Sequence, residues 1–482
     1  MASVAESALT NLKAAGLDRA LLTPSQESYD SRNASYFSRT AQLKPWAIVQ
    51  PRNAEEVSKT LKALVRTPGC KFAVRSGGHM QWAGANNIQN GITIDLGQMT
   101  KTTYNPETQI ASLLPGGTWA DAYKELEKHD RMVAGGREGS VGIGGLLAGG
   151  GKTFYTCRTG FACDQVVNYE IVLADGTIVE ANDQMNSDLF RVLKGGGNNF
   201  GIITRFDMVT FPSKDIWDGN ILCAKDSTSQ LVESLVDFIK NLAENPDSHV
   251  VAVWTYLPKT EDHFINMSLT SLDGEKETQS LNKFLAIPGQ RDMKMTTVAT
   301  KVASFALDVG LPAGKENIWF SLTFKADSRI VHRAAEVFET SVGNLKAKIP
   351  GHDFVFMMVL QPLPMSFGLH STARGGNMLG LERIKSDCFL LLFILEVETP
   401  ELRTTVGFPT LKRATDEIEA FAESISGNVH FRYLNYCDGS QDPLRSSGED
   451  NVRKMRAAAA KYDPTGVFQT RVPGGFKISE VK

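Results

Sequence analysis

A short glycine-rich segment that ends in a histidine is the first candidate for chemistry in this sequence. In Arg75-Ser76-Gly77-Gly78-His79 the glycines permit positive φ angles and leave backbone amides uncovered. Uncovered amides can wrap an anionic pyrophosphate without the help of a lysine. Taken alone, the segment is equally typical of an ordinary loop in which the histidine is hydrogen-bonded.

Three further glycine-rich segments follow along the chain, at 139–145, 149–151 and 195–201. Residues without side chains lose much conformational freedom on folding, so this density indicates a close approach of the backbone to another group. A planar ligand lying on the backbone would explain it, and so would tight packing of two loops. The spacing differs from the GxGxxG turn that binds nicotinamide dinucleotides, and no Walker A sequence occurs.

Candidates for acid–base chemistry stand in two other places. The segment 432–436 offers Tyr433 and Tyr436, and His370 lies in a stretch expected to be a loop. Tyrosinate and imidazole can accept a proton when their pKa is tuned. In an extended segment the two tyrosines would point to opposite sides, so we expect only one of them in a site. The alternatives are that both tyrosines close an interface and that His370 is a hydrogen-bonded surface residue.

The elements that must position these residues begin with alternating strand-like and helix-like segments after Pro45. A helix is expected from Asn53 to Val65. Asn53 can cap its first turn, and Glu56 three residues later would complete a capping box. Alternation of this kind predicts an α/β lobe.

Two further elements are predicted in the first half of the chain. The segment 118–129 is helix-like because Trp119, Tyr123 and Leu126 fall on one face. A β-hairpin is expected around the turn Asp175-Gly176. Both elements extend the α/β pattern.

Beyond the break at Phe211-Pro212 the texture of the sequence changes. Strand-like runs such as VVAVWTYL, IWFSLTF, FVFMMVL and CFLLLFILEV are separated by amphipathic helices such as QLVESLVDFIKNL and RATDEIEAFAESI. This pattern predicts a mainly antiparallel sheet that is covered by helices. Trp254, Tyr256 and Phe320 lie on these runs, where they can line an apolar pocket or pack in the core.

Composition and charge narrow the classes of partner. The 51 lysines and arginines and the 54 aspartates and glutamates leave a formal charge of −3, with no basic block of the kind that binds nucleic acid. The N-terminal stretch carries polar groups every few positions, so we expect a cytoplasmic protein without a secretion signal or a membrane span. Six cysteines without a CxxC pair argue against a metal site and a disulfide framework. We expect a monomer or a weak homodimer that acts on a small molecule.

Taken in order, these segments resemble the FAD-linked oxidases of the vanillyl-alcohol oxidase superfamily. Within it they resemble the berberine-bridge-enzyme-like group, and in particular its fungal members of secondary metabolism. The resemblance is carried by PWAIVQPRNAEEV, VRSGGH, DLGQM, PGGTWADAYKEL, SVGIGG, LAGGG and KGGGNNFGIITRF, and by the tail motifs YLNY and KYDPTGVF. It covers the first half of the chain closely and the middle only loosely.

The resemblance implies an α+β, bilobal fold. A PCMH-type FAD-binding lobe of two α/β subdomains would span 1–212, with its core at about 41–212. A substrate-binding lobe with the mainly antiparallel sheet would span 213–428. Residues 429–482 would return to the FAD-binding lobe.

The same resemblance implies roles for single residues. His79 matches the histidine bonded to the flavin 8α-methyl group, so covalently bound FAD is expected. Arg75, Ser76, Gly77 and Gly78 match the turn that holds the pyrophosphate. Further contacts along the cofactor are implied for Ser140, Val141, Gly142, Gly145, Gly149, Ile203 and Asn435. A tyrosine of the YLNY segment faces the flavin N5 region in similar enzymes, and valine at position 141 is compatible with access of O2.

One departure from the family pattern is informative. Many members attach the flavin a second time through a cysteine just before the VGxGG motif, whereas Arg137-Glu138-Gly139 contains no thiol. We therefore expect a flavin tethered through His79 alone, with a lower redox potential than a doubly tethered one. Leu146 stands where relatives often carry another histidine.

The leading interpretation is an FAD-dependent oxidase of a hydrophobic or aromatic small molecule, such as an alkaloid or polyketide-type intermediate. Such an enzyme transfers hydride to flavin N5 and is reoxidised by O2 to H2O2. The apolar strands of the second lobe and the missing secretion signal favour it. Two alternatives stay open: a carbohydrate oxidase that forms a lactone, and a flavin-containing cyclase with no net oxidation.

Overall fold

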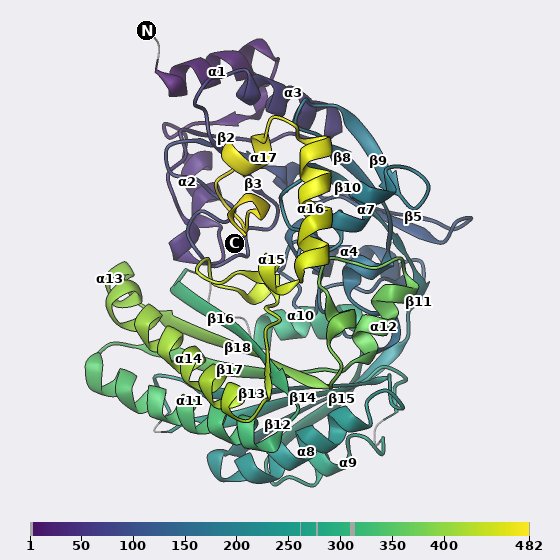
Figure 1. The fold of residues 1–482 in the computed structure, drawn as a ribbon, viewed down its shortest axis with the longest axis vertical. Helices are drawn as coiled ribbons and strands as arrows, with labels where there is room; N and C mark the ends of the chain where they lie inside the picture. The colour runs from purple at the N-terminus through teal and green to yellow at the C-terminus, as the bar shows by residue number, and fades with distance from the viewer. Residues whose placement is uncertain (1–2, 261, 276–277, 309–313, 482) are drawn as a thin grey trace.

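In the computed structural model, two lobes lie one above the other and the C-terminal segment is placed among the elements of the first (Figure 1). The structure describes residues 3–260, 262–275, 278–308 and 314–481. Within these residues the strands form a four-stranded, a five-stranded and an eight-stranded sheet and a two-stranded ribbon. The fold is therefore of the α+β class with two lobes, as the sequence predicts.

The four-stranded sheet opens the first lobe, with the order β1-β2-β4-β3. Of its three pairings, β2 with β4 and β4 with β3 are parallel, and β1 with β2 is antiparallel. Apolar side chains fill both faces, as is usual for parallel strands between helices. The strands are β1 (Leu21–Leu22), β2 (Ala47–Val49), β3 (Phe72–Arg75) and β4 (Ile92–Asp95), and the helices are α1 (Val4–Ala14), α2 (Glu27–Ala34) and α3 (Ala54–Val65).

Helix α3 confirms the predicted position of its N-cap. The side chain of Asn53 accepts a hydrogen bond from the Glu56 amide at 2.8 Å. The Glu56 carboxylate accepts one from the amide of Arg52, however, and not from that of Asn53. The predicted capping box is therefore only half formed, because the carboxylate reaches one residue further back along the chain.

The five-stranded sheet has the order β5-β6-β10-β8-β9 and is antiparallel throughout. It contains the predicted hairpin, whose turn includes Gly176 at a φ of 80°. Trp119, Tyr123 and Leu126 are fully buried on one face of α4, as predicted. The elements are β5 (Thr102–Asn105), β6 (Ile110–Leu113), β8 (Val166–Val172), β9 (Ile178–Asn182), β10 (Ile202–Val209), α4 (Trp119–Glu127), α5 (Ile143–Ala148), α6 (Thr156–Thr159) and α7 (Ser187–Leu193).

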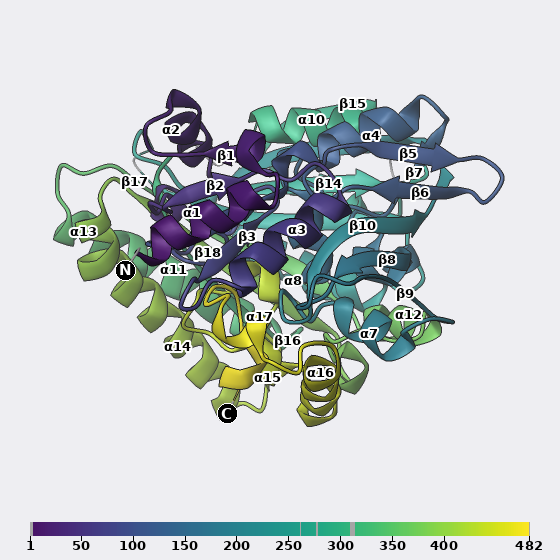
Figure 2. The same ribbon diagram turned by 90° about the horizontal axis from the view of Figure 1, so that it is seen from above.

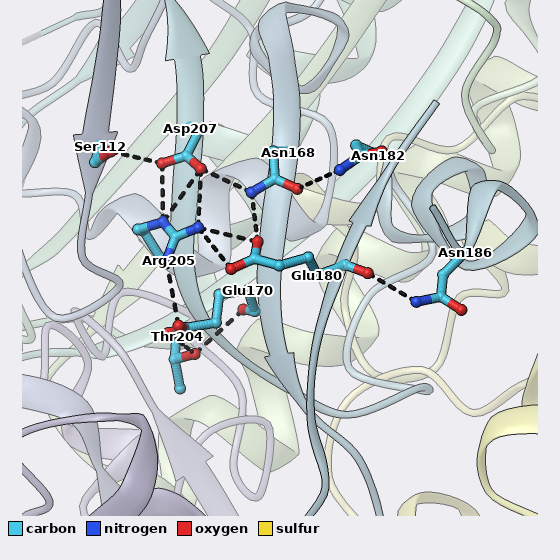
Figure 3. A network of polar contacts seen from close by, with 9 residues as sticks. All are labelled: Ser112, Asn168, Glu170, Glu180, Asn182, Asn186, Thr204, Arg205 and Asp207. Carbon is cyan, nitrogen blue, oxygen red and sulfur yellow. Dashed lines mark hydrogen bonds and ion pairs between the residues drawn. The ribbon is translucent and has the colours of Figure 1, made fainter. Parts of the chain in front are cut away.

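A charged network ties the strands of this sheet together (Figure 3). The Arg205 guanidinium on β10 lies 3.2 Å from a Glu170 oxygen, 2.9 Å from Glu180 and 3.0 Å from Asp207. Asn168 donates to Asp207 at 2.8 Å. The network spans β8, β9 and β10, so it reinforces the register that the backbone ladder sets.

The eight-stranded sheet of the second lobe has the order β15-β12-β14-β13-β17-β18-β16-β19, with all pairs antiparallel. Figures 1 and 2 show α8, α11 and α14 along the face that points away from the first lobe. The strands are β12 (Asp215–Ala224), β13 (Ser248–Tyr256), β14 (Phe264–Ser271), β15 (Gln290–Thr297), β16 (Glu316–Lys325), β17 (Phe354–Leu363), β18 (Cys388–Val397) and β19 (Asn428–Val429). The helices are α8 (Thr228–Lys240), α9 (Asn282–Leu285), α10 (Val298–Asp308), α11 (Ser328–Lys348), α12 (Ser366–Ala373), α13 (Pro400–Leu402) and α14 (Phe408–Ser424).

Two features mark the ends of the lobes. The two-stranded ribbon pairs β7 (Arg131–Met132) with β11 (Phe211–Pro212), so the expected boundary after 212 falls between β11 and β12. The last helices, α15 (Pro443–Ser446), α16 (Glu449–Tyr462) and α17 (Val467–Thr470), follow the second lobe. On α16, Lys461 and Tyr462 bind Asp188 of α7 at 2.7 and 2.6 Å, which fastens the tail to the first lobe.

Several general expectations can be compared with the described residues. All six cysteines are buried, free thiols. None of the helices in the described part of the chain has the length and apolar character needed to cross a membrane. The same residues contain no group of three or more histidines, cysteines or acidic side chains placed to hold a metal ion.

Candidate functional site

A cavity of about 620 Å³ lies between the lobes. The glycine-rich segments of the first lobe form one wall, the eight-stranded sheet forms the opposite wall, and the C-terminal segment closes the side. Large concave cavities at the junction of lobes are the usual location of small-molecule sites.

The first wall contains most of the residues expected to contact a cofactor. Nearly all of those named from the sequence border the cavity: Ser76, Gly77, Gly78, His79, Ser140, Val141, Gly142, Gly145, Gly149, Ile203 and Asn435. A Cβ on Gly77 would lie 2.6 Å from the Gly142 Cα, so these glycines let two loops pack backbone to backbone. Gly145 has no neighbour within 4 Å of its ideal Cβ position, so its missing side chain keeps the cavity open. Tight packing of two loops thus accounts for Gly77 and Gly142, whereas Gly145 leaves open space on the cavity side.

Arg75 is an exception among these residues. Its side chain is buried and stacks on the Tyr36 ring, with 3.7 Å between the guanidinium carbon and the ring centroid. It donates hydrogen bonds to the Arg32 carbonyl at 2.8 Å and to the Ser35 carbonyl at 3.0 Å. The cavity lining does not include it. The Arg75 guanidinium therefore supports the turn 75–78 from behind the cavity wall.

His79 stands at the edge of the first wall between an aromatic ring and a carboxylate. Its imidazole is stacked on Phe37, with centroids 4.2 Å apart and an interplanar angle of 13°. Its Nε2 lies 3.5 Å from a Glu138 oxygen. Burial alone would raise the pKa of Glu138, but the interaction with His79 and the hydrogen bonds from Ser140 outweigh it and lower that pKa. An ionised carboxylate on Nε2 leaves Nδ1 as the nitrogen with a free lone pair.

Tyr433 and Tyr436 do not follow the extended geometry assumed from the sequence. Tyr433 precedes and Tyr436 ends a 3-10 turn, η8 (Leu434–Tyr436). Residues three apart in such a turn lie on the same side. The two rings accordingly meet edge to face, with centroids 4.8 Å apart, and both border the cavity. The expectation of opposite sides is therefore wrong.

The two hydroxyl groups differ in their surroundings. The Tyr433 oxygen accepts hydrogen bonds from the backbone amides of Gly151 and Lys152 at 3.0 and 2.9 Å and from Asn435 Nδ2 at 3.1 Å. Burial raises the pKa of Tyr433 further above its usual value, so this hydroxyl keeps its proton. The Tyr436 oxygen accepts from Arg137 Nη2 at 3.1 Å and from Gln361 Nε2 at 3.3 Å. Tyr436 is thus the phenol whose oxygen faces a cationic donor, whereas the donors to Tyr433 are all neutral.

Asn435 is fixed between the tail and the first wall. Its Nδ2 donates to the Leu146 carbonyl at 3.1 Å. A Cβ on Gly149 would lie 1.8 Å from its Oδ1, so only glycine leaves room for this amide. The need for glycine at 149 therefore comes from the tail.

His370 is not where its proposed catalytic role requires. It belongs to helix α12 rather than to a loop, and its Nε2 donates to the Cys157 carbonyl at 2.7 Å. It is not among the residues that border the cavity. The expectation of a catalytic His370 is therefore wrong for this geometry, and the hydrogen-bonded alternative describes it.

The opposite wall is apolar and was not identified from the sequence. The side chains that face the cavity belong to alternate positions on β13, β16, β17 and β18: Val251, Val253, Trp319, Met357, Val359, Leu392 and Ile394. The strand register aligns them in rows, since Val253 is opposite Val359 and Met357 is opposite Ile394. Trp254, Tyr256 and Phe320 lie in the core against the helices, as the second alternative for them stated. Successive side chains on a strand point to opposite faces, so Val253 and Trp319, next to Trp254 and Phe320 in the sequence, face the cavity.

A polar cluster interrupts this apolar wall beside Tyr436. Arg137 Nη1 lies 3.1 Å from His249 Nε2, and Arg137 Nη2 donates to the Gln361 carbonyl oxygen at 2.6 Å. Burial, together with the charge of Arg137, lowers the pKa of His249 and of Lys152 far below their usual values. His249 is therefore neutral and accepts the Arg137 hydrogen bond. Sequence reasoning missed this cluster because its members are 112 and 224 residues apart and share no motif.

Residues 45–182 match the family model described as an FAD binding domain. The chain is 37% identical over 457 residues to the FAD-dependent monooxygenase drtC of Aspergillus calidoustus, which covers 94% of this chain and 86% of that protein.

Solved structures share the fold at lower identity. Xylooligosaccharide oxidase from Myceliophthora thermophila C1, in complex with xylobiose, superposes with a TM-score of 0.79 at 19% identity, covering 98% of this chain and 99% of the other. Glucooligosaccharide oxidase from Acremonium strictum, with a 6-S-cysteinyl, 8α-N1-histidyl FAD, gives a TM-score of 0.77 at 19% identity and covers 99% of both chains.

Proposed function

Because this chain belongs to the PCMH-type FAD-linked oxidoreductases, we propose that it is an oxidase of a hydrophobic or aromatic small molecule, such as an alkaloid or polyketide-type intermediate. The observation that carries this proposal is an apolar wall with one proton-accepting group, Tyr436, at its polar end. Bound FAD would accept a hydride from the substrate and pass the electrons to O2, giving H2O2.

The residues of the first wall fit FAD. The backbone of Ser76, Gly77 and Gly78 offers amides for the pyrophosphate, and Gly145 leaves open space where a flat ring needs it. His79 at the edge of this wall is the group that would carry the covalent bond to the flavin. Its Nδ1 makes no hydrogen bond to any described residue, which suits a nitrogen reserved for that bond.

A single tether is part of the proposal. In glucooligosaccharide oxidase the flavin carries both a cysteinyl and a histidyl bond. Here the six cysteines are buried elsewhere, and Glu138 and Gly139 occupy the stretch before the VGxGG motif. The Glu138 side chain contacts His79, and this stretch offers no thiol for a second bond to the flavin. Val141 borders the cavity and, as a small side chain, leaves a path for O2.

The chain's own groups divide the remaining work. Tyr436 would take the proton that the substrate loses together with the hydride. Arg137 and Gln361 hold its oxygen in place. Tyr433 fixes the amides of Gly151 and Lys152 and so supports the floor of the cavity. The apolar side chains exclude water from the reacting atoms.

The experiment that tests this function is turnover of a panel of aromatic alcohols, amines and polyketide-type phenols under ¹⁸O2. The proposal predicts one H2O2 per molecule of product and no ¹⁸O in the product. Incorporation of ¹⁸O would indicate a monooxygenase. Turnover of xylobiose but of no aromatic compound would indicate a carbohydrate oxidase. Product formation without O2 and without bleaching of the flavin would indicate a cyclase.

A further inference from the structure

The polar cluster of the cavity carries a positive charge that no carboxylate of the described residues balances. Arg137 is bonded to three neutral acceptors, the His249 imidazole, the Gln361 carbonyl and the Tyr436 hydroxyl. A guanidinium keeps its charge across the accessible pH range. Arg137 is half-buried, and even partial removal of an unbalanced charge from water is unfavourable, so proteins normally pair such a charge with an acid.

The nearby acids are already engaged. Glu138 interacts with His79, and the buried carboxylate of Asp218 is paired with Lys301. Among the described residues, no carboxylate lies within ion-pair distance of Arg137 or Lys152. Lys152 is 5% exposed and borders the cavity, and among the described residues its Nζ donates a hydrogen bond only to the Pro362 carbonyl, at 2.9 Å.

The positive charge of Arg137 acts on its basic neighbours. After burial, the charge of Arg137 is the next cause that lowers the pKa of both His249 and Lys152. Lys301 and Lys152 add to this effect on His249. The groups that face the cluster from β13, β17 and the tail are thus all neutral or basic. This end of the cavity has a positive potential that a bound anion would relieve.

Arg137 also retains hydrogen-bonding capacity. A guanidinium has five N–H donors, and the structure accounts for three of them, to His249, Gln361 and Tyr436. The remaining donors belong to a side chain that borders the cavity. Planar donors of this kind match a carboxylate or another resonance-stabilised oxyanion.

From these observations we infer that Arg137 recognises an anionic oxygen group, a carboxylate or an ionised enol or phenol, on a substrate whose remainder is apolar. The inference rests on the proposed function for the identity of the cavity as the substrate site. It narrows the substrate class from hydrophobic molecules in general to amphipathic acids. Binding of the oxyanion beside Tyr436 would place the neighbouring part of the substrate next to the base, and the rows of Val253, Val359 and Ile394 would hold its apolar body.

A pair of matched probes can test this recognition without turnover. Cinnamate and cinnamamide have the same shape and differ in charge, and binding near a flavin perturbs its absorption spectrum. Each is titrated into the resting, oxidised holoenzyme. We expect cinnamate to bind at least tenfold more tightly than cinnamamide, because only the carboxylate compensates the Arg137 charge.

Variants identify the residue responsible. Arg137→Met should abolish the preference, so that both probes bind with similar dissociation constants. Arg137→Gln keeps a hydrogen-bonding amide without the charge and should have the same effect, which guards against misfolding of the first variant. Arg413→Met, at an exposed position on α14, is the control and should leave the tenfold preference unchanged.

Three results would overturn the inference: equal binding of the two probes to the unaltered enzyme, no binding of cinnamate, or a preference that survives both Arg137 substitutions. The last result, accompanied by a shift in the flavin redox potential, would assign Arg137 to the flavin instead. The binding titration does not depend on catalysis. Failure to oxidise any compound of the aromatic panel would therefore disprove the proposed function without affecting the comparison of cinnamate with cinnamamide.

Discussion

At the scale of single residues, the two tyrosines of the tail are distinguished by their hydrogen-bond partners. Tyr436→Phe should slow flavin reduction by about 10²- to 10⁴-fold with the flavin still bound, since it removes the proton acceptor. Tyr433→Phe should have a smaller effect on this rate and lower the free energy of unfolding by about 1–3 kcal/mol, because two buried amides lose their acceptor. Anaerobic stopped-flow with the best substrate of the panel and denaturant unfolding measure the two effects. A larger loss of rate in Tyr433→Phe than in Tyr436→Phe would reverse the assignment.

The carboxylate beside His79 leads to a second prediction at this scale. Glu138→Gln should slow covalent attachment of FAD to apoprotein at least tenfold, because the neutral amide no longer directs the His79 proton to Nε2. The acid-stable flavin absorbance followed over time gives the rate. Glu125→Gln, which alters an exposed pair with Lys128, is the control. Attachment at the unaltered rate in Glu138→Gln would show that the carboxylate has no part in it.

How far residues could be predicted depended on whether their neighbours in space are neighbours in sequence. The turn at 76–79, the segment 140–145 and the tail tyrosines each form a local motif, and the structure places them on the cavity. Arg137, His249 and Gln361 come from a loop and two strands, so only tertiary folding brings them together. Arg75 and His370 show the converse, because a local motif does not reveal which way a side chain turns.

At the scale of elements, periodicity predicted the strands of the second lobe but not which face borders the site. A strand that is buried on both sides carries apolar side chains on both faces. The sequence therefore does not show which face packs against the helices and which borders the cavity. The hairpin at Gly176 and helix α4 were predictable because turn residues and amphipathic spacing are local signals. The order of strands, with β16 between β18 and β19, depends on contacts far apart in the chain.

The charged network of the five-stranded sheet gives a prediction for an element (Figure 3). Arg205→Met should lower the free energy of unfolding by about 2 kcal/mol, since it leaves the carboxylates of Glu170, Glu180 and Asp207 facing one another. The loss should shrink in 1 M NaCl, because the Arg205 side chain is 26% exposed and salt screens the repulsion. Arg329→Met removes an ion pair at a side chain that is 64% exposed and should leave the free energy of unfolding nearly unchanged. Equal effects of the two substitutions would contradict the role given to the network.

At the scale of the whole molecule, the cavity exists because two lobes and the tail meet. The glycine-rich wall, the apolar wall and the tail tyrosines come from three parts of the chain that each have their own elements. The bilobal class could be predicted because composition changes along the chain. The shape of the cavity could not, because it depends on how side chains from separate lobes interlock.

A buried acid in the second lobe makes global stability depend on pH. Glu396 on β18 is 2% exposed, and neither of its carboxylate oxygens has a hydrogen-bond partner among the described residues. Burial raises the pKa of Glu396 from 4.5 to about 7, against a small opposing effect of Lys315. The folded state therefore holds this proton more tightly than the unfolded state. Its contribution to stability is fully present below pH 4.5 and is lost as the pH rises through about 7.

Glu396→Gln keeps the neutral form at every pH. The variant and the unaltered protein should have similar free energies of unfolding near pH 4.5. By pH 8 the variant should be more stable by on the order of 3 kcal/mol. Urea unfolding at a series of pH values checks this. A difference that is constant between pH 4.5 and 8 would show that Glu396 does not titrate in this range.

The central claim is that this oxidoreductase holds its FAD through a single covalent bond to His79. Acid precipitation of the purified holoenzyme, followed by proteolysis and mass spectrometry of the yellow pellet, tests it most directly. We expect the flavin to stay in the pellet on one peptide that contains His79. In His79→Ala the flavin should be released to the supernatant. Flavin found wholly in the supernatant of the unaltered protein, or attached to any residue other than His79, would contradict it.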